Sequence, residues 1–165
     1  MADSTKSGEF AVSIVDYEPR HRTYFERFNA EWLNDHFRVE AVDQAMFDDP
    51  EGTILNRGGH ILMGYLGENC VGTCALIQRD PGVFELAKMG VTKPARAKHV
   101  GRGLVEASIT RAIAVRATRL YLATNSRLST AIALYRRLGF VVTRTGPDPI
   151  YERVDTVMTY TKPLT

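Results

Sequence analysis

The residues best suited to chemistry lie in a basic loop with two glycines, within the stretch VTKPARAKHVGRGLVEAS that spans Val91 to Ser108. The loop follows an apolar, strand-like segment and leads into a helical pattern that begins at or just before Gly101. Free backbone N–H groups at a helix N-terminus attract anions, and Arg96, Lys98 and Arg102 add positive charge. The pattern predicts a phosphate or pyrophosphate site. A basic surface loop with a helix-starting glycine is the alternative.

Other motifs with a known chemistry are missing from the sequence. It contains neither the G-x-x-x-x-G-K-[ST] pattern of a P-loop nor a full G-x-G-x-x-G after a strand. Cys70 and Cys74 lie four residues apart without a Cys or His pair at zinc spacing, so we expect two buried, reduced thiols on one face of one strand. The histidines His21, His36 and His60 are scattered, and no metal site is predicted.

Length and charge narrow the classes of function. The chain has 165 residues, of which 44% are hydrophobic, and this suits one well-buried domain. We predict a flexible tail over residues 1–9 and a single domain over 10–165. The net charge of +2 favours neither a nucleic-acid nor a membrane partner. The polar N-terminus resembles neither a signal nor a transit peptide, so we expect a cytoplasmic protein.

Hydrophobic periodicity predicts the elements of the first half of the chain. A β-branched, alternating segment is followed by two helical patterns and then by three strand patterns in a row. The predicted elements are a strand over Phe10–Tyr17, helices over His21–Phe37 and Val39–Phe47, and strands over Gly59–Leu66, Cys70–Gln78 and Val83–Val91.

After Val91 the pattern changes to alternating helices and strands. The predicted elements are a helix over Val100–Arg116, a strand over Arg119–Thr124, a helix over Leu128–Leu138, and strands over Gly139–Thr145 and Tyr151–Lys162. The order β-α-α-β-β-β-α-β-α-β-β implies an antiparallel sheet that becomes parallel at one crossover, a mixed α/β or α+β architecture.

The strand that precedes the basic loop carries an acidic residue. Strict alternation places Phe84, Leu86, Lys88 and Gly90 on one face, and Val83, Glu85, Ala87, Met89 and Val91 on the other. This alternation puts the Glu85 carboxylate on a largely apolar face.

The stretches FELAKMGVTKPARAKHVGRGLVEASI and RLYLATNSRLSTAIALYRRLGF closely resemble the GNAT acetyltransferase superfamily. The resemblance covers roughly Phe10 to Lys162, and the element order is that family's order. It implies the GNAT fold, a mostly antiparallel sheet of about seven strands that splays between the fourth and fifth, with about four flanking helices. It also implies acetyl-CoA as co-substrate and no metal.

In this family the loop after the fourth strand carries [QR]-x-x-G-x-[GA], whose amides hold the pyrophosphate of acetyl-CoA. The register RAKHVG fits best, and His99 then occupies the middle glycine position, which tolerates a side chain unless it requires positive φ. A shifted register, KHVGRG, keeps both glycines. The resemblance implies cofactor binding by Arg96, Ala97, Lys98, His99, Val100, Gly101 and Arg102, and by main-chain groups of Met89 and Val91.

Two residues match positions that carry the family's chemistry. Acetyl transfer needs a neutral amine, and Glu85 in FELAKM is the candidate general base, acting directly or through water. Pairing with an arginine across the sheet is the alternative. Tyr135 matches the tyrosine of the A-x-x-L-Y-x-x-x-G-F motif, which the family uses as general acid near the thioester sulfur. A purely structural aromatic on the core face of its helix is the alternative.

Asn125 is a further candidate for cofactor binding. Family members often carry an asparagine seven residues before the tyrosine, a position that Leu128 occupies here. Asn125 could reach the same cleft, or could cap the next helix together with Ser126 and Ser129. The resemblance also implies an acceptor pocket built partly from the first two helices, where Glu31, Asn34 and Asp35 are candidates for contact with a cationic substrate.

The sequence therefore predicts an acetyl-CoA-dependent N-acetyltransferase that acts on a primary amine of a small molecule or protein by direct transfer in a ternary complex. A homodimer is common in the family. A non-catalytic acyl-CoA-binding or regulatory module is the competing interpretation. A basic-loop adaptor for RNA or DNA is a third, and the near-neutral charge argues against it.

Overall fold

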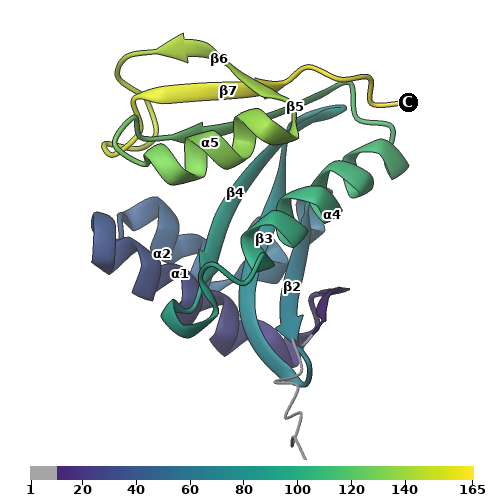
Figure 1. Cartoon of the computed structure of the whole chain (residues 1–165), viewed down its shortest axis with the longest axis vertical. Helices are drawn as coiled ribbons and strands as arrows, with labels where there is room; N and C mark the ends of the chain where they lie inside the picture. The colour runs from purple at the N-terminus through teal and green to yellow at the C-terminus, as the bar shows by residue number, and fades with distance from the viewer. Residues whose placement is uncertain (1–10) are drawn as a thin grey trace, which may run out of the picture.

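The computed structural model describes residues 11–165, which form seven strands and five helices (Figure 1). The strands are β1 Val12–Asp16, β2 His60–Leu66, β3 Asn69–Asp80, β4 Val83–Val91, β5 Arg119–Thr124, β6 Phe140–Thr145 and β7 Thr156–Tyr160. The helices are α1 Arg22–His36, α2 Ala41–Asp48, α3 Pro50–Thr53, α4 Val100–Ala114 and α5 Ser129–Leu138. The predicted tail, residues 1–9, and the predicted first strand residue, Phe10, lie outside the described residues.

All seven strands form one sheet in the order β1-β2-β3-β4-β5-β7-β6. Every neighbouring pair is antiparallel except β4 and β5, which are parallel. The predicted change from antiparallel to parallel at one crossover is confirmed. The last two strands form a hairpin whose second strand, β7, lies inside the sheet, so that β6 becomes an edge strand.

β4 and β5 pair over only part of their length. Val83–Leu86 lies beside Arg119–Leu122, but β4 continues to Val91 without this neighbour. The sheet is therefore split at the C-terminal end of both strands (Figure 1). Because ligands in sheets with parallel strands bind beyond the carboxyl ends of those strands, the split is the place to look for a site.

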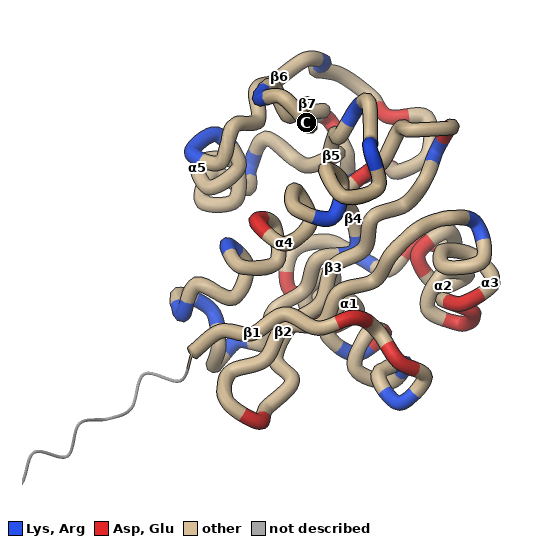
Figure 2. The backbone as a smooth tube through the Cα atoms, turned by 90° about the vertical axis from the view of Figure 1, so that its right-hand side faces the viewer, with Lys and Arg blue, Asp and Glu red and all other residues tan. Residues whose placement is uncertain are grey.

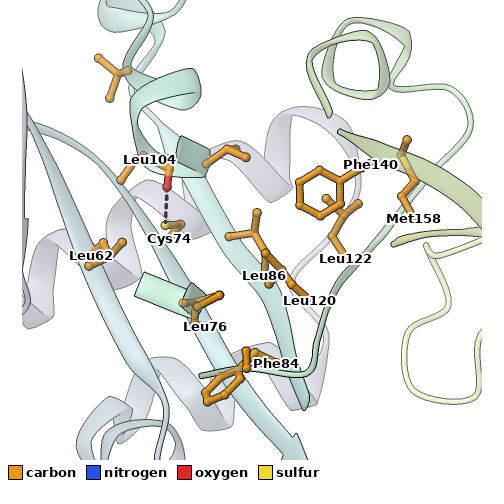
Figure 3. Packing of buried hydrophobic residues seen from close by; sticks show 14 of the residues in the cluster. Leu62, Cys74, Leu76, Phe84, Leu86, Leu104, Leu120, Leu122, Phe140 and Met158 are labelled. Carbon is orange, nitrogen blue, oxygen red and sulfur yellow. Dashed lines mark hydrogen bonds between the residues drawn. The ribbon is translucent and has the colours of Figure 1, made fainter. Parts of the chain in front are cut away.

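Each face of the sheet carries its own core. On one face α4 and α5 cover leucines of β3, β4 and β5 together with Phe140 and Met158 (Figure 3). On the other face α1 and α2 pack on β2 and β3 through Phe25, Leu33 and Phe47. The apolar residues Phe25, Phe28 and Leu33 of α1 are buried.

A bulge interrupts β4 at Lys88. Ala87 pairs with Ala75 and Gly90 with Thr73, so two residues of β4 stand opposite one residue of β3, and Lys88 has φ 51°. Met89 and Val91 consequently contact the α4 side of the sheet, whereas Ala87 packs on the α1 side. The prediction that Met89 and Val91 share the face of Glu85 was wrong, because the bulge reverses the alternation.

A second bulge lies in β3. Gly72 pairs with Gly64 and Cys70 with Tyr65, which leaves Val71 as the extra residue. Cys74 is fully buried on the α4 side, while the half-buried Cys70 packs against the opposite core. The prediction of two buried cysteines on one face was therefore wrong.

Most other predicted boundaries agree to within about two residues with the observed ones. The last strand is shorter than the predicted Tyr151–Lys162, because residues 151–155 form a loop that precedes β7. The four-residue α3 was not predicted; its N-cap, Asp49, accepts a hydrogen bond from the Gly52 amide at 3.0 Å. No helix within residues 11–165 is long and apolar enough to cross a membrane.

Candidate active site

A cleft of about 900 Å³ opens where β4 and β5 part. It passes through the sheet, since α1 lines it on one face and the first turn of α4 together with α5 lines it on the other. Most of the predicted site residues meet there: Glu85, Met89, Val91, Arg96, Ala97, His99, Val100, Gly101, Arg102, Asn125 and Tyr135. Lys98 is exposed and does not line the cleft.

The first turn of α4 presents free backbone donors to this cleft. The first backbone hydrogen bond of α4 runs from the Gly103 N–H to the His99 carbonyl, at 3.0 Å. Within residues 11–165 the N–H groups of Val100, Gly101 and Arg102 have no such acceptor, as expected at a helix start. The Val100 side chain is buried against β2 and β3 and anchors the turn. Free amides at a helix start are suited to binding an anion.

Gly101 and Gly103 differ in their surroundings. A Cβ at Gly101 would have no protein atom within 4 Å, whereas one at Gly103 would lie 3.0 Å from Val12 Cγ1. Gly103 thus allows close packing of α4 on β1, but packing does not explain Gly101. A glycine that costs helix stability and leaves empty space in a cleft suits the close approach of a ligand. The amides and the open space fit a diphosphate and favour the register that ends at Gly101.

Two non-glycine residues of the loop have left-handed backbone conformations. Ala97 has φ 66° and His99, the N-cap of α4, has φ 65°. Such conformations cost about 1–3 kcal/mol each and persist only where the surroundings impose them. The glycine position that His99 fills therefore does require positive φ. The loop keeps its turn with a histidine, one of the residues enriched in this region.

The basic side chains of the loop have partners that orient them. Arg96 donates from Nε to the Val91 carbonyl at 3.1 Å and pairs with Asp35 of α1 at 3.3 Å. Arg102 pairs with Glu106 one turn along α4, at 2.8 Å. Arg96 thus ties the end of β4 to α1 at the border of the cleft, and its position is set by both.

Tyr135 projects from α5 into the cleft and makes an edge contact with Phe140, with ring centroids 6.1 Å apart. Burial, followed by the nearby Cys74 thiol, raises the pKa of Tyr135 well above its ordinary value. The phenol therefore keeps its proton throughout the neutral range. A protonated phenol can donate to a leaving group that becomes negative.

Glu85 lines the cleft but already has a partner. Its carboxylate, which is 5% exposed, accepts hydrogen bonds from Arg79 of β3, the shortest being 3.0 Å. Arg79 is the arginine across the sheet that the sequence left open as an alternative. The contact gives Glu85 a structural function, and the residue also lines the cleft.

Asn125 lines the cleft with both ends of its side chain engaged. Its amide donates to the Arg153 carbonyl at 2.9 Å, and its oxygen accepts from the Arg127 N–H at 2.9 Å. The N-cap of α5 is Leu128, which makes no side-chain cap. The capping alternative was therefore wrong: Asn125 and Ser126 hold the β5–α5 loop to the loop that precedes β7, Ser126 through Asp155.

The comparison with protein families decides the class of protein. Residues 21–140 match the acetyltransferase (GNAT) family. The chain belongs to this family. No curated protein matches the sequence.

Solved GNAT structures share the fold at low sequence identity. An acetyltransferase from Staphylococcus aureus superposes with a TM-score of 0.80 at 24% identity, covering 91% of this chain and 98% of that one. An acetyltransferase from Salmonella typhimurium, solved with acetyl-CoA, gives 0.72 at 16%, covering 90% and 92%. A spermidine N-acetyltransferase chimera from Vibrio cholerae gives 0.72 at 16%, covering 90% and 94%.

A buried ion-pair network, which sequence patterns did not predict, borders the GNAT cleft. Asp43 of α2 is fully buried and accepts from Lys88 Nζ at 2.6 Å and from Arg153 at 2.8 Å. Lys88 also donates to the Tyr151 hydroxyl at 2.8 Å, and Arg153 pairs with Glu40 at 2.8 Å. A lysine in an apolar strand was the one available signal, because a buried lysine requires a charged partner.

Proposed function

We propose that this GNAT protein is an acetyl-CoA-dependent N-acetyltransferase that moves the acetyl group directly to a primary amine of a small molecule or protein within a ternary complex. The single observation that carries the proposal is the meeting of the free amides around Gly101 with the protonated Tyr135 in one cleft. The amides suit the diphosphate of the cofactor, and Tyr135 suits the departing thiolate.

The reaction divides between two side chains. The neutral amine attacks the thioester carbonyl and forms a C–N bond, and the tetrahedral intermediate collapses with cleavage of the C–S bond. Tyr135 gives its proton to the leaving thiolate, and the amine proton passes to Glu85 directly or through water. Solvent exchange restores both residues.

The surroundings of the cysteines support direct transfer over a covalent acyl-enzyme. Burial raises the pKa of the Cys74 thiol to about 12, and burial also raises the pKa of Cys70. Neither side chain lines the cleft. A thiol that stays protonated is a poor nucleophile. Both cysteines are free, which agrees with the cytoplasm as the compartment that we propose.

A non-catalytic acyl-CoA-binding module is the second candidate, and the Glu85–Arg79 ion pair favours it because it gives the carboxylate a structural reason to be present. Calorimetric titration with acetyl-CoA, followed by a coenzyme A release assay against an amine library, separates the candidates. An enzyme binds the cofactor and releases coenzyme A only when an acceptor is added. A non-catalytic module binds acetyl-CoA but releases no coenzyme A when an acceptor is added. If the protein does not bind acetyl-CoA at millimolar concentration, both candidates are overturned.

A further inference from the structure

The end of the cleft next to α1 combines aromatic and cationic side chains. Trp32, Phe37 and Tyr151 supply rings, and Lys88, Arg127 and Arg153 supply positive charge. Among the described residues, Glu85 is the only acidic side chain that lines the cleft. The net charge at this end therefore depends on which carboxylates pair with these three cationic side chains.

The carboxylates that contact the cations of this end, and the one acidic side chain in the described cleft lining, are ion-paired. Acidic residues are present on α2 and α3 (Figure 2), and among them Asp43 of α2 is fully buried between Lys88 and Arg153. Glu40 pairs with Arg153, and Glu85 pairs with Arg79. A cationic acceptor such as a polyamine would thus find no free carboxylate among the residues that line the cleft.

The residues that the sequence suggested for contact with a cationic acceptor do not fill this gap. Glu31, Asn34 and Asp35 of α1 do not line the cleft. Asp35 pairs instead with Lys93 at 3.2 Å and with Arg96 at 3.3 Å, on the cofactor side.

Of Lys88, Arg127 and Arg153, only Arg127 lacks a carboxylate partner within residues 11–165. It extends from the β5–α5 loop over the Phe37 ring at the end of α1, with the guanidinium carbon 5.2 Å from the ring centroid. Only its Nε approaches a protein acceptor, Asn125 Oδ1 at 3.4 Å. A guanidinium stacked on a ring presents its outer N–H groups in a plane, which matches a carboxylate.

We propose that the acceptor is a small amine that carries a carboxylate, such as a free amino acid, and that Arg127 binds this carboxylate. The inference rests on the proposed acetyltransferase function and names its acceptor class. The rings of Trp32, Phe37 and Tyr151 offer apolar surface to the side chain of such an acceptor.

The test measures coenzyme A release with saturating acetyl-CoA and four acceptor classes: L-amino acids, their carboxamides, O-phosphoethanolamine and spermidine. We expect kcat/KM to be highest for amino acids. Arg127→Gln should lower it about tenfold to hundredfold through KM, the size of a lost charged hydrogen-bond pair, and should leave the carboxamides unchanged. Arg119→Gln is the matched control, since Arg119 also stacks on a ring, Tyr121 at 5.0 Å, but does not line the cleft.

Calorimetric titration of the coenzyme A complex with the same four classes separates this inference from the proposed function. Amino-acid binding that weakens in Arg127→Gln supports the inference even without turnover, in which case the enzymatic function fails. Turnover that favours spermidine or the carboxamides, or that is equal in Arg127→Gln, overturns the inference and leaves the acetyltransferase intact. Equal use of O-phosphoethanolamine would also overturn it, because charge alone would then suffice. If amino acids are neither bound nor acetylated, the inference is also overturned.

Discussion

Replacing Gly101 by alanine should move protein stability and acetyl-CoA affinity in opposite directions. The new Cβ would meet no protein atom within 4 Å, so it introduces no clash. Alanine is better than glycine inside a helix by up to about 1 kcal/mol. For a chain of this size, that gain corresponds to a rise in Tm of about 2–4 °C without ligand.

The same methyl group would occupy the space that the structure leaves open in front of the free amides of α4. A phosphate pushed away from one of these amides loses a hydrogen bond to a charged group, worth about 1.5–3 kcal/mol. Acetyl-CoA should therefore bind about ten- to hundredfold more weakly to Gly101→Ala. At a fixed ligand concentration well above Kd, tenfold weaker binding removes about 1.4 kcal/mol of the stabilisation by ligand.

Isothermal calorimetry gives the affinity, and thermal unfolding with and without acetyl-CoA gives both effects on stability. Gly103→Ala is the matched control, because its Cβ would lie 3.0 Å from Val12 Cγ1 and outside the cleft lining. It should lower stability or leave it unchanged, with wild-type affinity. If Gly101→Ala binds acetyl-CoA as tightly as the wild type, the diphosphate does not lie over this turn and the assignment of the cofactor site is wrong.

Three further substitutions test the rest of the site. Tyr135→Phe should lower turnover about a hundredfold or more with little change in acetyl-CoA affinity. Turnover equal to that of the wild type would show that Tyr135 is not the general acid. Glu85→Gln should slow turnover most at low pH, where neutral amine is scarce; a pH–rate profile of wild-type shape would leave Glu85 only as the partner of Arg79. Burial raises the pKa of Asp43, but hydrogen bonds from Arg153 and the charge of Lys88 outweigh this and hold it below the ordinary value. Its contribution is thus present above the unfolded pKa of about 3.9 and is lost as the pH falls further. Asp43→Asn should cost about 3–5 kcal/mol at neutral pH in urea unfolding, and an equal cost at pH 3 would contradict this reasoning.

The element order and the parallel crossover could be predicted because they depend on local periodicity, which survives in one sequence. The strand Val83–Val91 was predicted to its ends, since turns flank an apolar run on both sides. The motif around Tyr135 and the loop before α4 could be recognised because their chemistry requires fixed spacings. Tyr135 and most residues of that loop line one cleft.

The errors arise where one extra residue shifts the alternation. Neither Val71 nor Lys88 carries a local signal for a bulge, yet each reverses the faces of the residues beyond it, and Cys70 and Met89 were misplaced for this reason. The loop over residues 151–155 was misread as strand because its aromatic and β-branched residues suit a sheet. Its conformation instead follows from long-range partners, Asp43 for Arg153 and Lys88 for Tyr151.

Lys88 connects the bulge to the cleft. In a regular strand it would share the face of Phe84 and Leu86 and place its ammonium in the core under α4, where an unpaired charge costs several kcal/mol. The bulge turns it to the other face, where Asp43 and Tyr151 receive it. The same irregularity lies beyond Leu86, the last residue of β4 that pairs with β5. One buried lysine thus favours the distortion that accompanies the split in the sheet, and its partners tie the loop that forms the far wall of the cleft.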